Sequence, residues 1–480
     1  MNWEIVIGLE IHVELSTRSK IFCGCSTAFG AAPNTQCCPA CIGMPGTLPV
    51  LNEMVLEYAV KAGLGLNCEI QRHNRFDRKN YFYPDLPKAY QNSQLYLPIC
   101  RDGQVEISLS TGETKTVRIR EIHMEEDAGK LIHSPAGDCT YLDYNRGCVP
   151  LIEIVSEPDM RSAEEVLAYL DHVKSTLEYL EVSDCQMQEG SLRADVNLSV
   201  RPLGSTVLGV RTEMKNLNSF RAIERAIAAE ADRHISTIES GGTLEQETRR
   251  WDDNKGESFA MRSKENAQDY RYFPDPDIPP IVVEEALIER CLKSQPEFRA
   301  AKTARFVSDY GLGGKEAATI TAERKIAALF EDTLALARSP KEVSAWILGD
   351  MMYLMGAEGV SPGALRIKPP AFAAFVNAIT EGAINRTAGK QVFEYLFGGG
   401  EDVAGYIEEH GLAQISDDGA IQTAVDKVIA AHAGPVAEYR GGKTKTFGFL
   451  VGQVMKELQG KGNPAQINEI LKQKLEEGSQ

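Results

Sequence analysis

The chain has 480 residues, of which 43% are hydrophobic and 25% charged, as in globular proteins of about two to four domains. No apolar run approaches the ~20 residues that cross a membrane, and the N-terminus lacks the basic-then-apolar pattern of a signal peptide, so we expect a cytoplasmic protein. The net charge of −17 argues against indiscriminate binding to nucleic acid. Residues 427–474 nevertheless contain eight Lys and Arg against three acidic residues.

Five residues near the N-terminus recur later in the chain with one conservative change. Residues 10–14 are EIHVE, and residues 121–125 are EIHME. Apolar residues alternate over residues 3–15, which predicts a strand. Because successive side chains of a strand point to opposite faces, the Glu, His and Glu of each copy share one face. One copy alone could be a solvated acidic face, but two copies favour divalent-metal chemistry.

Five of the eleven cysteines lie between positions 23 and 41. Cys23 and Cys25 form a C-x-C, and Cys38 and Cys41 form a C-x-x-C, which together match the spacing of a four-thiolate zinc site. Cys37 is then the expected non-ligand. Disulfides are disfavoured in a cytosolic chain, and a redox role is disfavoured because no βαβ pattern follows. Four thiolates leave no open coordination position, so we expect a structural site.

Other predicted strands also carry polar residues on one face. These residues are Arg193, Asp195, Asn197 and Ser199 on one strand, Arg211, Glu213 and Lys215 on a second, and Glu153 and Glu157 on a third. Carboxylates hold Mg²⁺ while Arg and Lys neutralise a transferring phosphoryl group, so this combination suits a nucleoside triphosphate. A solvated face is the alternative for each strand alone. No Walker A or dinucleotide-binding glycine motif occurs, so ATP would bind on an open sheet.

The segment Asp77–Tyr90 interleaves basic and aromatic residues. This pattern suits stacking on bases with contacts to phosphate. It equally suits a loop that packs its own aromatic residues around prolines, and the residues alone leave both alternatives open.

The first part of the chain is rich in strand signals and the second part in helix signals. Up to about residue 290 strands alternate with turns, and a helix begins at Ser162, which forms a capping box with Glu165. A second helix is predicted over about 220–240. Beyond the prolines of residues 270–280 the pattern becomes helical and rich in alanine. We therefore expect an α+β domain, a helical domain and a small helical tail.

At several of these places the chain resembles the B subunit of the aspartyl/glutamyl-tRNA(Asn/Gln) amidotransferases. The matching segments are IGLEIHVEL (7–15), FDRKNYFYPDLPKAYQNSQ (76–94), HMEEDAGK (123–130), PLIEIVSEPD (150–159), EGSLRAD (189–195), KNLNSF (215–220), DYRYFPDP (269–276) and residues 446–475. The resemblance implies a cradle-shaped catalytic domain over 1–292, with a mixed sheet like that of glutamine synthetase and a zinc-binding insertion at 23–41. It also implies a helical domain over 293–400 and a tRNA-binding tail over 401–480.

The resemblance further implies a reaction in two steps. The side-chain carboxyl of Glu misacylated on tRNA(Gln), or of Asp on tRNA(Asn), is phosphorylated with Mg-ATP, and ammonia then displaces phosphate. Phosphorylation is needed because a carboxylate repels nucleophiles and offers only an oxide leaving group. The chain lacks the Ser-Ser-Lys signature of an amidase, so ammonia would come from a separate glutaminase subunit of the amidase family, and a small third subunit would complete a heterotrimer.

The resemblance also assigns roles to residues of this sequence. Glu10, His12 and Glu125 are expected to be catalytic residues and magnesium ligands, with Glu157 as a further ligand. Arg193, Asp195 and Lys215 are expected around ATP and the acyl phosphate, and Cys23, Cys25, Cys38 and Cys41 are expected to bind structural zinc. His123 is expected to support the ligands, so the repeated motif would supply parts of one metal-ATP site.

Two other classes of function remain open at this point. A two-metal phosphohydrolase or nuclease would also place His and carboxylates on adjacent strands, but it would need neither ATP nor a partner. A non-catalytic RNA-binding protein would need the cysteines and the basic tail but not His12. The residues do not decide between Glu-tRNA(Gln) and Asp-tRNA(Asn) as the substrate.

Overall fold

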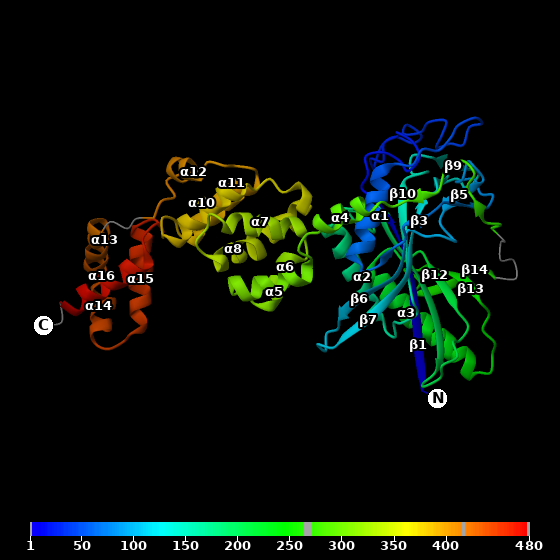
Figure 1. The fold of residues 1–480 in the computed structure, drawn as a ribbon. Coiled ribbons are helices and arrows are strands. Elements are labelled where there is room, and N and C mark those ends of the chain that lie inside the picture. Colours follow the sequence, from blue (N-terminus) through cyan, green and yellow to red (C-terminus); the bar gives the residue numbers. More distant parts are fainter. Residues whose placement is uncertain (1, 264–269, 415–417, 478–480) are drawn as a thin grey trace. The chain divides into compact units, whose positions relative to one another are not determined.

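The computed structural model describes residues 2–263, 270–414 and 418–477, and the chain forms two compact units, Met1–Phe298 and Arg299–Gln480. Figure 1 shows a first unit built around a sheet and a second unit built from helices. The predicted α+β fold, with a mixed sheet followed by helical regions, is confirmed. None of the described helices is long and apolar enough to cross a membrane. Asp269, the first residue of one matching segment, lies outside the described residues.

The first unit contains the described strands and helices α1 to α4. The strands are β1 (Trp3–Glu14), β2 (Glu69–Ile70), β3 (His73–Asn74), β4 (Asp77–Asn80), β5 (Tyr90–Ser93), β6 (Cys100–Ser108), β7 (Thr114–Glu126), β8 (Lys130–His133), β9 (Thr140–Asp143), β10 (Pro150–Ser156), β11 (Leu192–Pro202), β12 (Thr212–Lys215), β13 (Glu247–Asp252), β14 (Glu257–Ser263), β15 (Phe273–Pro274) and β16 (Ile281–Val282). The helices are α1 (Glu53–Gly65), α2 (Ala163–Tyr179), α3 (Phe220–Glu239) and α4 (Glu285–Lys293).

Nine strands form one mixed sheet in the order β14-β13-β12-β11-β1-β10-β7-β6-β2, with β1 at its centre. Only β12 and β13 pair in parallel among these described neighbours. Alternation along β1 buries Leu9, Ile11 and Val13 in the apolar core, where α1, α2 and α3 pack against the sheet. The opposite face of the sheet carries Glu10 and His12, and we call it the polar face.

The two long helices predicted from the sequence begin at capping serines. The Ser162 side chain accepts a hydrogen bond from the backbone N–H of Glu165 at the start of α2, and Ser219 accepts one from Ala222 at the start of α3. The apolar stripes of both helices lie in the same core as the sheet. Local sequence signals therefore place the helices, and burial of their stripes attaches them to the sheet.

The second unit is built from helices around two separate apolar cores. The helices are α5 (Arg299–Tyr310), α6 (Gly314–Thr321), α7 (Arg324–Leu334), α8 (Pro340–Trp346), η2 (Ile347–Met351), α9 (Met352–Glu358), η3 (Pro362–Ala364), α10 (Pro369–Thr380), α11 (Arg386–Phe397), α12 (Val403–Glu409), α13 (Asp418–Ala431), α14 (Ala433–Arg440), α15 (Lys445–Glu457) and α16 (Pro464–Glu477). One core is centred on Trp346, which packs against Phe375 and Phe393, and the other is formed by α13 to α16. The domain boundaries suggested at 292 and 400 stay predictions.

Candidate active site

The polar face brings the two copies of the repeated motif together around β10. Cross-strand register places His12 opposite Arg193 on β11 and opposite Glu153 on β10. Glu153 in turn lies opposite His123 on β7. One row of side chains therefore runs across four neighbouring strands, because directly opposed residues of antiparallel strands point to the same face.

The first group of potential metal ligands consists of His12, Glu125 and Glu153, whose ligand atoms lie within 4.8 Å of one another. Nε2 of His12 lies 3.4 Å from Oε2 of Glu153 and 3.7 Å from Oε1 of Glu125. Burial disfavours the imidazolium, but the charges of Glu153 and Glu125 outweigh burial and raise the pKa of His12 to about 9. The buried Oε2 of Glu125 has no hydrogen-bond partner in the described structure. A buried orphan carboxylate oxygen in this donor set fits a divalent cation.

The second group consists of Glu10, Asp195 and Glu213, whose carboxylate oxygens also lie within 4.8 Å of one another. The Lys215 ammonium pairs with Asp195 and lies 2.7 Å from Oε1 of Glu213. Burial and the nearby charges of Glu153 and Glu213 raise the pKa of Glu10. Three carboxylates beside one ammonium keep a net negative charge, which suits a divalent cation.

A row of side chains continues from the second group toward the β14 edge of the sheet. Arg250 on β13 lies opposite Lys215, and Phe259 on β14 lies opposite Arg250. The Phe259 side chain is 41% exposed, and the Lys255 ammonium lies 4.8 Å from its ring centre. A cationic group and an exposed aromatic ring beside potential metal ligands suit a nucleotide, whose phosphates and base they would contact.

Glu157, which was predicted as a magnesium ligand, joins neither group. The pairing of β10 with β7 shifts at a β-bulge after Val155, and Glu157 forms an ion pair with Arg120 at 3.0 Å. The bulge interrupts the period-two alternation that had assigned Glu153 and Glu157 to one face. The structure therefore brings Glu153, rather than Glu157, into the first group.

Arg193, predicted near ATP, is held by a buried carboxylate. Its Nη2 lies 2.9 Å from Oδ2 of Asp127, and Nε of Arg146 lies 3.5 Å from the same oxygen. Burial opposes the charge of Asp127, but the two guanidinium groups outweigh burial and lower the pKa of this carboxyl. Burial and the neighbouring Asp127 raise the pKa of Glu14 to about 8. Both arginines are thus already neutralised in part by Asp127.

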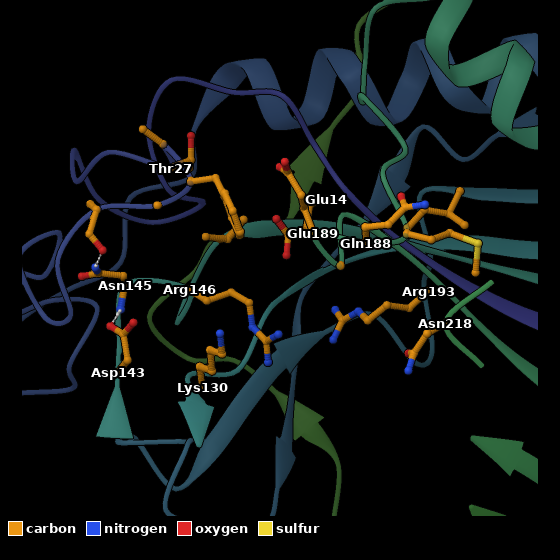
Figure 2. Close-up of a pocket in the computed structure, with 18 of the residues that line it drawn as sticks. Glu14, Thr27, Lys130, Asp143, Asn145, Arg146, Gln188, Glu189, Arg193 and Asn218 are labelled. Atoms are coloured by element: carbon orange, nitrogen blue, oxygen red, sulfur yellow. Dashed lines mark hydrogen bonds between the residues drawn. The ribbon is translucent and has the colours of Figure 1, made fainter. Parts of the chain in front are cut away.

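A cavity of about 940 Å³ opens beside these residues, and we call it the polar cavity. Its charged lining residues are Glu14, Lys130, Asp143, Arg146, Glu189, Arg193 and Asp195. In Figure 2 the carboxylates of Glu14 and Glu189 lie above the cationic ends of Lys130, Arg146 and Arg193. The cavity adjoins the second group because Asp195 belongs to both. Its volume lies in the usual range of small-molecule sites.

The structure brings together the thiols predicted to bind zinc. The Sγ atoms of Cys23, Cys25, Cys38 and Cys41 lie within 4.8 Å of one another. The buried Lys20 ammonium lies 3.7 Å from Sγ of Cys41. A hydrogen bond from Cys23 lowers the pKa of the Cys41 thiol to about 4; burial opposes this shift, and the Lys20 charge adds to it. Four clustered thiols with a buried cation to offset their charge fit Zn²⁺, and bound zinc stays a prediction.

The loop between the two cysteine pairs forms one wall of the polar cavity. The lining residues from this loop are Thr27, Ala28, Phe29, Gly30, Ala31, Pro33 and Gln36. Nδ2 of Asn34 donates to the backbone oxygen of Leu142 at 2.8 Å, and the backbone N–H of Gln36 donates to Oδ1 of Asn145 at 2.8 Å. These bonds tie the predicted zinc-binding insertion to the hairpin of β8 and β9.

Comparison with known proteins assigns the chain to a family. A family model described as the GatB/GatE catalytic domain matches residues 5–289, and one described as the GatB domain matches residues 328–475. The chain belongs to the GatB family. The B subunit of an aspartyl/glutamyl-tRNA(Asn/Gln) amidotransferase from Lachnoclostridium phytofermentans is 56% identical to it over 98% of this chain and 99% of the relative. Proteins of the same name from Lachnospira eligens and Caldicellulosiruptor bescii are 54% and 52% identical, each over 99% of this chain and 99% and 100% of the relatives.

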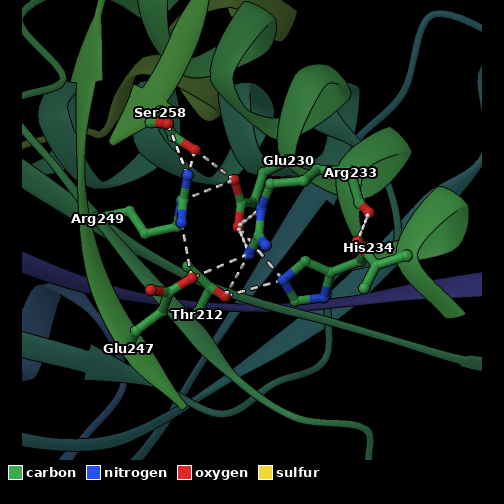
Figure 3. A network of polar contacts seen from close by, with 8 residues as sticks. Thr212, Glu230, Arg233, His234, Glu247, Arg249 and Ser258 are labelled. Atoms are coloured by element: carbon green, nitrogen blue, oxygen red, sulfur yellow. Dashed lines mark hydrogen bonds and ion pairs between the residues drawn. The ribbon is translucent and has the colours of Figure 1, made fainter. Parts of the chain in front are cut away.

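A buried polar network, which Figure 3 shows, joins the sheet to α3 on the face opposite the polar face. The Glu230 carboxylate on α3 accepts hydrogen bonds from Arg233 at 2.6 Å and from Ser258 on β14 at 2.7 Å. Thr212 on β12 lies 2.8 Å from Nε2 of His234 on α3. Burial opposes the charge of Glu230, but its partners, His234 and Arg233 foremost, lower the pKa of this carboxyl to about 2. The network holds β12 and β14 against α3.

Two polar residues hold potential ligands of the second group in place. Oγ1 of Thr248 on β13 donates a hydrogen bond to Oε2 of Glu213 at 2.8 Å. Nδ2 of Asn197 on β11 donates one to Oε1 of Glu10 at 3.0 Å. Partners of this kind orient metal ligands.

Sequence reasoning missed Glu153 and Glu213 as members of the two groups. Period-two alternation had already assigned both to polar faces. The missing signal was cross-strand register, which sets Glu153 opposite His12 and Glu213 opposite Asn197. No local pattern in the sequence encodes this register.

Proposed function

We propose that this chain is the component of a tRNA-dependent amidotransferase that converts Glu-tRNA(Gln), Asp-tRNA(Asn) or both into the correctly charged amide, with Mg-ATP as the activating substrate. The relatives are named for this activity. The supporting observation in this chain is the pair of potential metal-ligand groups on one sheet face, beside Lys215 and Arg193. Phosphoryl transfer depends on such a concentration of metal ligands and cations.

The proposed reaction exchanges bonds in two steps. An oxygen of the substrate side-chain carboxylate attacks the γ-phosphorus of ATP, the bond to the β,γ-bridging oxygen breaks, and ADP leaves. Ammonia then attacks the carbonyl carbon of the acyl phosphate, phosphate leaves with the bonding electron pair, and the nitrogen loses a proton to solvent. Activation converts an oxide, which is a poor leaving group, into phosphate.

Each part of the polar face has a role in this proposal. His12, Glu125 and Glu153 would hold one Mg²⁺, and Glu10, Asp195 and Glu213 would hold another. Bound Mg²⁺ would neutralise charge on the phosphates. Arg250 and Phe259 would bind the triphosphate and the adenine of ATP, because they continue the row of side chains toward the β14 edge and do not line the polar cavity.

The proposal also includes macromolecular partners. The exposed side chains of Lys443, Lys445 and Lys472 lie in the tail and suit contacts to tRNA phosphates. Ammonia would come from a glutaminase subunit of the amidase family, and a small third subunit would complete the heterotrimer. These assignments rest on family membership and on the charge of the tail.

The test supplies Glu-tRNA(Gln) or Asp-tRNA(Asn), Mg-ATP and ammonium to the chain assembled with the glutaminase and the small third subunit. We expect one ADP for each amide formed and no amide without ATP. A two-metal phosphohydrolase would release phosphate without ammonium, and an RNA-binding protein would bind tRNA without forming product. Absence of amide from both substrates would contradict the proposed function.

A further inference from the structure

We propose that the polar cavity binds the aminoacylated 3′ end of the substrate tRNA, with the α-ammonium of the amino acid at Glu189 and the terminal phosphodiester at Lys130. This assignment rests on the proposed function and adds the place and the recognition chemistry of the acceptor substrate. ATP then approaches the metal-ligand groups over Lys215 and Arg250, which do not line the cavity.

The position of the cavity supports this assignment. Asp195 lines the cavity and belongs to the second group, and Arg193 lines it opposite His12. A ligand in the cavity can therefore direct a carboxylate toward both groups. The volume of about 940 Å³ accommodates an aminoacyl nucleotide, since sites for ligands of this size measure roughly 300–1,000 Å³.

The charges that line the cavity favour an aminoacyl ester over ATP as its ligand. Arg146 and Arg193 both pair with Asp127, which reduces their charge toward a ligand. Lys130 and Glu189 are exposed residues of the cavity lining, and neither forms an ion pair or a side-chain hydrogen bond with any described residue. The basic side of the cavity thus offers Lys130 and the one positive charge that Asp127 leaves uncompensated on the two arginines, and the acidic side offers the Glu189 carboxylate. A triphosphate needs several cations, whereas an aminoacyl nucleotide carries one ammonium and one phosphodiester.

The arrangement of these charges matches the geometry of the ligand. Figure 2 shows the Glu189 carboxylate on the acidic side of the cavity and Lys130 on the basic side. An α-ammonium on the acidic side leaves the side-chain carboxylate free to extend toward Arg193. Phe29 lines the cavity from the cysteine loop and is 73% exposed, so it offers a stacking surface for a terminal base.

The experiment measures binding of two stable probes to the chain assembled with its partner subunits. The first probe is adenosine 5′-phosphate carrying glutamate through a 3′-amide, and the second carries glutarate, which lacks the α-ammonium. We expect wild type to bind the first probe about tenfold more tightly, the effect of one charge-assisted contact. E189Q should abolish this preference and leave the affinity for the glutaryl probe unchanged. E113Q, an exposed acid in the turn between β6 and β7, should behave as wild type.

Lys130 is tested with the same probe lacking its 5′-phosphate. K130A should remove the gain in affinity that the phosphate confers, without changing affinity for ATP. The assignment would be overturned if E189Q still preferred the probe with the ammonium. It would also be overturned if F259A weakened binding of the glutamyl probe as strongly as it weakened binding of ATP. If wild type forms no amide from either aminoacyl-tRNA, the proposed function itself fails. If wild type forms the amide and E189Q keeps the probe selectivity of wild type, only the placement of the aminoacyl group in the polar cavity is refuted.

Discussion

Oε2 of Glu153 lies 3.4 Å from Nε2 of His12 and 3.0 Å from Nε2 of His123. One carboxylate on β10 therefore joins the two copies of the repeated motif, which lie on β1 and β7. Charge from His123 and His12 outweighs burial and keeps the pKa of Glu153 well below its usual range. This contact makes Glu153 the link between both strands and the proposed first metal site.

Replacement of Glu153 should remove most of the activity. E153Q keeps the size of the side chain but removes its charge, so we expect ATP-dependent amide formation to fall at least about 100-fold. The matched variant is E157Q, because Glu157 pairs with Arg120 outside both groups. Loss of activity in E157Q as large as in E153Q would contradict the cross-strand arrangement. The measurement is the initial rate of Gln-tRNA(Gln) formation at saturating ATP.

Thr248 should act as a positioning residue for Glu213. T248V preserves the shape of the side chain but removes the 2.8 Å hydrogen bond to Oε2 of Glu213, so we expect kcat to fall about tenfold. The Mg²⁺ concentration at half-maximal rate should rise as well, which a change in stability alone would not produce. T116V, at an exposed position of β7, is the control. Equal Mg²⁺ dependence in T248V and wild type would rule out this role.

Loss of the predicted zinc should weaken binding in the polar cavity. Residues 27–36 lie between Cys25 and Cys38 and supply one wall of the cavity, so release of the metal should loosen that wall. C38S should lose the zinc, detected by elemental analysis, and bind the glutamyl probe at least about tenfold more weakly. C37S should retain both. Wild-type probe affinity in a C38S protein without zinc would show that the wall holds its conformation alone.

The network around Glu230 should make the first unit sensitive to acid. The folded-state pKa of about 2 lies below the ordinary value of 4.5, so the ionised carboxylate stabilises the fold above about pH 4.5. This contribution, about 2–3 kcal/mol, is lost as pH falls from about 4.5 toward 2. E230Q should unfold at lower urea concentration than wild type at pH 7, and the two midpoints should converge at low pH. A constant difference across this pH range would contradict the assignment.

Several features followed from local sequence patterns. Alternation along residues 3–15 placed Glu10 and His12 on one face of a strand, because strand side chains alternate regardless of the partner strand. Ser162 marked the start of α2 through its own side chain. The spacing of the cysteines indicated a thiolate cluster, since short loops keep residues of such pairs close together.

Tertiary structure decided which side chains meet. The register of β10 against β1 placed Glu153 beside His12 and left Glu157 beyond the end of β10, and the register of β11 and β12 gathered Glu10 with Asp195 and Glu213 in a separate group. The polar cavity joins residues from loops and strands far apart in the chain, such as Phe29, Lys130 and Glu189. The sequence by itself determined the strands, the helix starts, the cysteine cluster and the family. Only the fold determined the ligand partners and the cavity, because pairing register and loop packing depend on contacts between distant segments.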